Sequence, residues 1–276
     1  IRPFSGFQAF LAFPDSAALR SDFFAGEDTA VTAPSRSWIT TPAPRADRDF
    51  PRRLYLYRTF LQAQRVRAAA RAHRGGTVVV VVGYFHKGDI ESILAHDSTI
   101  TVVQPSSFGR PSAGAVERAT TREHRAAILT FNLLGRQAET GVIGWDWIER
   151  VLAALDPGAP TAEAELFAAR LAQLRGRLSP SAIVDRYRDL VRRIPESATF
   201  TWTGVKDASR VDSFFDPFGN LTVRQRAVVE LAGALQHVGK RAEARSLIDD
   251  LAAALGPRKG RQLLTYALET RLRTAP

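Results

Sequence analysis

The sequence predicts an α/β fold, with a parallel sheet flanked by helices and followed by a large all-helical carboxyl-terminal region. Two continuous apolar runs, residues 77–82 and 99–103, lack polar alternation, which is typical of parallel strands covered on both faces. A short helical stretch at 89–96 separates them, as a right-handed crossover between neighbouring strands requires. From residue 113 onward, apolar residues recur at helical spacing.

The composition is that of an ordinary globular protein, because 45% of the 276 residues are hydrophobic and 24% are charged. No apolar run approaches the roughly 20 residues that span a bilayer, so no transmembrane segment is expected. The first residues do not follow the order of a signal peptide. These features leave the localisation open: a cytoplasmic protein is slightly favoured, and an exported mature protein is the alternative. The absence of cysteine excludes disulfides, thiolate metal sites and a cysteine nucleophile.

The net charge of +10 raises the question of nucleic-acid binding. The excess is almost entirely arginine, and it is spread along alanine-rich helical stretches instead of forming one patch. The sequence contains no zinc finger, aromatic RNA-binding motif or basic heptad arm. We predict no specific nucleic-acid partner.

The first part of the chain divides into an irregular segment and a helix. Residues 1–50 are rich in proline, and their aromatic residues predict loops and short elements that pack on the rest. Asp49 and Pro51 suit a helix start, and residues 52–72 contain neither glycine nor proline. The apolar residues of this helix cover a wide arc, as expected for a helix on a sheet. Gly75 and Gly76 end it.

In the carboxyl-terminal region, Ser179 and Pro180 predict a helix start. Two apolar stripes on either side of Gly239 predict an antiparallel helical hairpin within residues 222–273, which also includes a third helix from residue 260. The side chains expected in its seam are Leu231, Leu235, Leu247, Ile248 and Leu251.

A candidate site follows from element lengths. The helix from Arg52 would be about 30 Å long and the returning strand about 20 Å, so Arg52 and Arg53 should lie near Gly83 and His86. Basic residues near a histidine at a helix start favour an anionic group. A structural role for His86 and a solvated helix start at the arginines are the alternatives.

Residues 48–104 carry a resemblance to a known superfamily. Arg52-Arg53-Leu-Tyr-Leu-Tyr-Arg-Thr-Phe, a long helix, an apolar strand and Gly83-Tyr84-Phe85-His86 resemble the second half of TraB/Tiki, ChaN and erythromycin-esterase-like proteins. Members include metal-dependent peptidases, haem-binding lipoproteins and macrolide-inactivating hydrolases. The first Gly-x-x-His motif of the family is absent from residues 1–50, so either the first strand precedes Ile1 or the activity has been lost. Arg53 and Phe85 also depart from the family pattern.

The resemblance implies a metal-dependent hydrolase acting on a small molecule or a peptide. It implies a divalent metal bound by His86, with Arg52 and Arg53 in the catalytic site. Gly83, Tyr84 and Lys87 are candidate ligand-binding residues. Binding of haem or another anionic ligand is the first alternative. The second is an interaction scaffold that uses its carboxyl-terminal helices to bind a protein partner. The expected domains are residues 1–112, which are α/β, and residues 113–276, which are helical.

Overall fold

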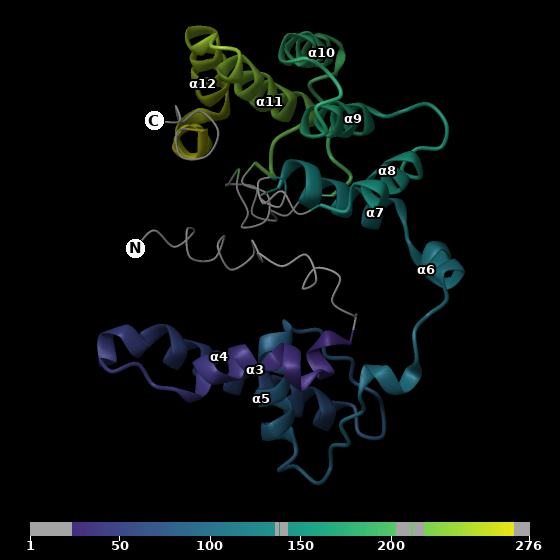
Figure 1. The fold of residues 1–276 in the computed structure, drawn as a ribbon, viewed down its shortest axis with the longest axis vertical. Coiled ribbons are helices and arrows are strands. Elements are labelled where there is room, and N and C mark those ends of the chain that lie inside the picture. Colours follow the sequence, from purple (N-terminus) through teal and green to yellow (C-terminus); the bar gives the residue numbers. More distant parts are fainter. Residues whose placement is uncertain (1–23, 136–137, 139–142, 203–210, 212–217, 268–276) are drawn as a thin grey trace. The chain divides into compact units, whose positions relative to one another are not determined.

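The computed structural model describes residues 24–135, 138, 143–202, 211 and 218–267 (Figure 1). These residues form two compact units that divide between Ser112 and Ala113. The described residues contain helices and no strand. The predicted parallel sheet, and with it the α/β fold class, is therefore wrong. The described residues from 113 onward are helical, as the sequence indicated.

The first unit consists of helices joined by extended segments. Asp28 caps the first long helix, and its carboxylate accepts the Ala30 N–H at 2.8 Å. The helix predicted from residue 52 is longer than expected, because it already begins at Ala46. The elements of the unit are η1 (Ala25–Glu27), α3 (Thr29–Thr40), α4 (Ala46–Ala72), α5 (Tyr84–Leu94) and η2 (Pro105–Phe108).

The two valine-rich runs at 77–82 and 99–103 do not pair into a sheet. The side chains of Val79 and Val81 are 81% and 90% exposed, so this run is not covered on both faces. β-branched residues favour an extended backbone, but a strand also needs a neighbour to complete its hydrogen-bond ladder. That ladder is absent from the described residues.

Helix α5 begins earlier than the predicted 89–96. Gly83 is its N-cap residue and Tyr84 its first residue, so His86 lies in the first turn of a helix and not in a loop after a strand. Asp89, which the spacing placed at the helix start, lies in the second turn. The helix packs on α4 around a small core of Ala63, Ile90 and Leu94.

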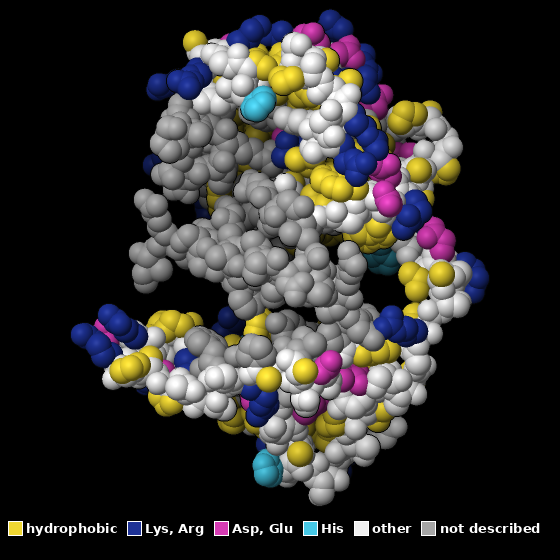
Figure 2. Space-filling view, viewed as in Figure 1, with side chains coloured by type: hydrophobic (Ala, Val, Ile, Leu, Met, Phe, Trp, Pro, Cys, Tyr) yellow, Lys and Arg dark blue, Asp and Glu magenta, His cyan; other side chains and the backbone are white. Residues whose placement is uncertain are grey.

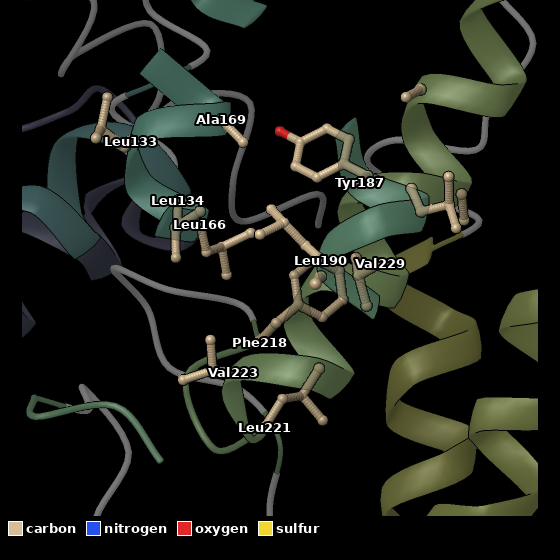
Figure 3. Packing of buried hydrophobic residues seen from close by; sticks show 14 of the residues in the cluster. Leu133, Leu134, Leu166, Ala169, Tyr187, Leu190, Phe218, Leu221, Val223 and Val229 are labelled. Carbon is tan, nitrogen blue, oxygen red and sulfur yellow. The ribbon is translucent and has the colours of Figure 1, made fainter. Parts of the chain in front are cut away.

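The second unit contains the main hydrophobic core, shown in part in Figure 3. Side chains from several helices, among them Leu166, Tyr187 and Leu190, lie close together there. Thr161, Ser179 and Thr222 cap three of these helices with their hydroxyl groups. The elements are α6 (Ala113–Ala119), α7 (Arg122–Leu129), the π-helical turn η3 (Thr130–Leu134), α8 (Trp145–Ala153), α9 (Ala162–Leu174), α10 (Pro180–Arg193), α11 (Val223–His237) and α12 (Arg241–Tyr266).

Helices α11 and α12 form the predicted hairpin (Figure 1). Gly239, with a φ of 81°, supplies the left-handed residue at the turn. The seam is confirmed: Leu231, Leu235, Ile248 and Leu251 are buried in the core, and Leu247 packs against it. Helix α12 breaks at Gly256, where φ is 78°. A Cβ added to Gly260 would lie only 2.2 Å from the carbonyl oxygen of Ala252, so the chain beyond the break requires glycine there.

An ionic network that the sequence analysis missed lies inside the second unit. Arg226 is fully buried on α11 and donates to Glu230 Oε1 at 2.9 Å and to the Leu134 carbonyl at 2.5 Å. Arg170 of α9 lies 3.5 Å from Glu230 Oε2 and donates to the Leu133 carbonyl at 3.0 Å. The two arginines thus satisfy carbonyls at the end of η3 and share one carboxylate.

No helix in the described part of the chain combines the length and apolarity needed to cross a bilayer.

Candidate functional site

His86 lies in the contact between α4 and α5. The Tyr55 ring stacks on the imidazole, with the ring centroids 4.6 Å apart and an interplanar angle of 10°. The Thr59 Oγ1 atom lies 2.7 Å from His86 Nδ1. Both partners belong to the buried face of α4, one turn apart. Helix α4 therefore covers one side of the imidazole.

The hydrogen bonds assign the proton of the neutral His86 ring. The Thr59 hydroxyl donates to the Tyr55 carbonyl at 2.9 Å, so its oxygen accepts from His86 Nδ1–H. Nε2 then carries the lone pair. Burial lowers the pKa of His86 below its ordinary value, the nearby positive charge of Arg58 lowers it further, and Asp89 opposes the shift. The neutral ring is therefore the favoured form near pH 7.

Tyr55 connects the imidazole to the backbone of α5. Its hydroxyl donates to the Phe85 carbonyl oxygen. Burial raises the pKa of Tyr55 to about 12, so the phenol stays protonated. Asp89 lies 3.8 Å from Arg36 of α3, which ties the third helix of the unit to the same cluster. These contacts fix the packing of the three helices.

The two predicted catalytic arginines lie elsewhere on α4. Arg52 donates to both carboxylate oxygens of Asp49 at 2.7 Å and to the Ile39 carbonyl at 3.1 Å. These bonds hold the start of α4 against the end of α3, and the Arg52 guanidinium lowers the pKa of Asp49 to about 2. Arg53, the next residue, is exposed. No contact with His86 is recorded for either arginine in the described unit.

The candidate ligand-binding residues are placed by α5. Gly83 precedes the helix, and Tyr84 is its first residue. Lys87 forms an ion pair with Glu91 at 2.9 Å and donates to Gln104 Oε1 at 2.7 Å. Gln104 in turn donates to Glu91 at 3.1 Å. Lys87 therefore holds the segment after α5 against the helix.

The residues around His86 do not fit the metal that the resemblance implies. Among the described residues, no group of three or more histidine, aspartate or glutamate side chains lies within ligating reach of one point. Asp89, the carboxylate closest in sequence, is engaged with Arg36. A hard or borderline metal ion needs several such donors.

Acid should destabilise the first unit through His86. Its folded-state pKa lies below the unfolded value of 6.5, so the unfolded chain binds more protons between these two values. The contribution of neutral His86 to the free energy of unfolding is therefore complete above the pKa of the unfolded chain, and it is lost as the pH falls through the lower pKa of the folded protein. The melting temperature of the wild type should fall more between about pH 7 and pH 5 than that of His86→Gln, in thermal melts followed by circular dichroism. An equal fall in melting temperature for the wild type and His86→Gln would contradict a lowered pKa of His86.

A second feature of α4 is its exposed apolar face, which we call the outer stripe: Phe50, Leu54, Tyr57 and Leu61. These residues recur every three or four positions and therefore share one side of the helix. Phe50 and Tyr57 are 62% and 61% exposed. Figure 2 shows hydrophobic side chains on the surface along α4. The opposite side of the helix carries Thr59 and Ala63, which are buried against α5.

Sequence reasoning did not separate these two faces. The wide apolar arc of α4 was interpreted as one surface lying on a sheet. The signal that distinguishes them was present, because the stripe residues follow a spacing of four, three and four, whereas Tyr55 and Thr59 fall on the opposite side. Comparisons with protein-family models, curated proteins and solved structures found no match for this chain.

Proposed function

We propose that this chain is a protein-binding module whose docking surface is the outer stripe of α4. The observation that supports the proposal is a helix with apolar side chains on two opposite faces, only one of which is covered in the described structure. A second apolar face on a helix is expected to be covered by a partner, because apolar side chains are stabilised by burial. An exposed contiguous apolar surface is typical of an interaction site.

The distribution of exposed apolar side chains supports the same interpretation. Most of the large apolar residues that are exposed among the described residues belong to the first unit, although the second unit is the larger. This distribution supports a docking surface on α4. The protein contact that the sequence suggested for the carboxyl-terminal helices stays a prediction. The apolar stripe of α11 and α12 is used within the unit, since its residues form the core.

Hydrolysis at His86 stays a prediction of the resemblance. The described contacts give it no further support, because the hydroxyl next to the imidazole belongs to Thr59, which is 1% exposed and donates to its own helix. A nucleophile must reach its substrate. The same contacts suit a histidine that positions two helices.

Site-specific photo-crosslinking tests the proposed function. A benzoylphenylalanine in place of Tyr57 in the full chain should form an adduct with a second protein in an extract of the producing cells. The same residue in place of Val116, which is 49% exposed on α6, should not form that adduct. The double variant Leu54→Asp, Leu61→Asp should abolish it without lowering the melting temperature, because both positions are exposed. An adduct to the chain itself, or loss of folding in the double variant, would contradict the proposal.

A further inference from the structure

The outer stripe has the spacing of a coiled-coil seam. Phe50, Leu54, Tyr57 and Leu61 are separated by four, three and four residues, which are the intervals between the a and d positions of a heptad. At about 1.5 Å per residue the stripe is about 17 Å long, or three helical turns. Phe60, which is 48% exposed, lies beside the stripe. Apolar residues at a and d intervals fit the side of a single partner helix.

The charged residues that flank the seam are all arginines, although Phe60, which is 48% exposed, occupies a g position. Arg53 occupies a g position of the heptad frame, and Arg58 and Arg65 occupy e positions. All three side chains are exposed, and none forms an ion pair with a described residue. Other arginines of α4 are engaged, since Arg52 binds Asp49 and Arg67 binds Asp97. From Phe50 to Ala72 the helix contains no acidic residue.

We propose that the partner is an acidic amphipathic α-helix of another protein, which places apolar residues on the outer stripe and Asp or Glu opposite Arg53, Arg58 and Arg65. The inference rests on the proposed function. Flanking charges at e and g select coiled-coil partners by complementarity. A second copy of this chain would bring the same arginines against one another, and each copy carries a net charge of +10. Like charges at these positions disfavour self-pairing.

Two synthetic peptides test the charge of the partner. Both have leucine at the a and d positions of about three heptads. One has glutamate at its e and g positions, and the other has lysine there. In fluorescence anisotropy titrations with the full chain, the acidic peptide should bind about tenfold or more tightly than the basic one. The preference should shrink as NaCl rises from about 50 to 300 mM, because surface charges are screened.

Matched variants show which arginines cause the preference for the acidic peptide. The triple variant Arg53→Gln, Arg58→Gln, Arg65→Gln should remove the preference for the acidic peptide. The control triple variant Arg118→Gln, Arg241→Gln, Arg258→Gln removes the same charge from exposed positions of the second unit and should leave the preference intact. Loss of the preference in both triple variants would overturn the inference, because it would show general attraction to a basic protein.

The remaining outcomes separate this inference from the proposed function. Equal binding of the two peptides, or no binding of the acidic one, overturns the acidic-helix partner but leaves the crosslinking result at Tyr57 to decide whether a protein docks there. Vesicles of phosphatidylcholine with phosphatidylserine are titrated in parallel. If the vesicles bind the chain through the outer stripe and the acidic peptide does not bind, the outer stripe is a membrane contact and the inference is wrong.

Discussion

Replacing Glu230 with alanine is expected to lower the free energy of unfolding by about 3–5 kcal/mol. Glu230 is 2% exposed and faces both Arg226 and Arg170, so its loss leaves two positive charges in the core without their shared carboxylate. Removing the carboxylate that two desolvated guanidinium groups share is strongly unfavourable. Urea denaturation with linear extrapolation measures the change.

Glu243→Ala is the matched control for this experiment. Glu243 accepts from Arg188 at 2.5 Å, but both side chains are well exposed, so solvent screens the pair and the variant should be nearly as stable as the wild type. The variant Glu230→Gln retains one of the two acceptor oxygens and should be destabilised less than Glu230→Ala. If Glu230→Ala proves no more destabilising than Glu243→Ala, the network is not buried in solution.

Replacing Leu235 with alanine should cost about 2–5 kcal/mol, because this fully buried side chain leaves a cavity in the seam between α11 and α12. The matching substitution Leu54→Ala in the outer stripe should change stability by less than about 0.5 kcal/mol, since Leu54 is 43% exposed. Urea denaturation of both variants measures the contrast. A cost at Leu54 comparable to that at Leu235 would show that the chain itself covers the stripe, and the proposed docking surface would be lost.

The helical parts of the fold were predictable because their signals are local. Residues 52–72 lack helix breakers, and Ser179-Pro180 provides the cap and first turn that begin α10. The seam of α11 and α12 followed from i, i+3 and i+4 spacing, which places the leucines on one face whatever the surroundings. The turn at Gly239 was also readable, because glycine readily adopts its positive φ.

The candidate site was predicted only in part. His86 and Gly83 do lie where α5 begins, next to α4. Their predicted proximity to Arg52 and Arg53 assumed that residues 77–82 form a strand running back along α4, and no such strand is present in the described residues. Arg52 instead binds Asp49, three residues away, a contact that helical geometry permits and that the sequence alone did not favour over others. Tyr55 and Thr59, the actual neighbours of His86, lie on the face of α4 that only packing identified.

The sequence by itself determined that α10, α11 and α12 are helical and which leucines of α11 and α12 share a face, because these depend on interactions within a few residues. Only the tertiary structure decided that the valine run at 77–82 has no strand partner, that Arg170 and Arg226 share Glu230, and that α4 buries one apolar face and exposes the other. Each of these depends on residues distant in sequence coming together. A strand, a buried charge and an apolar face all acquire their stability from a partner that local patterns do not specify.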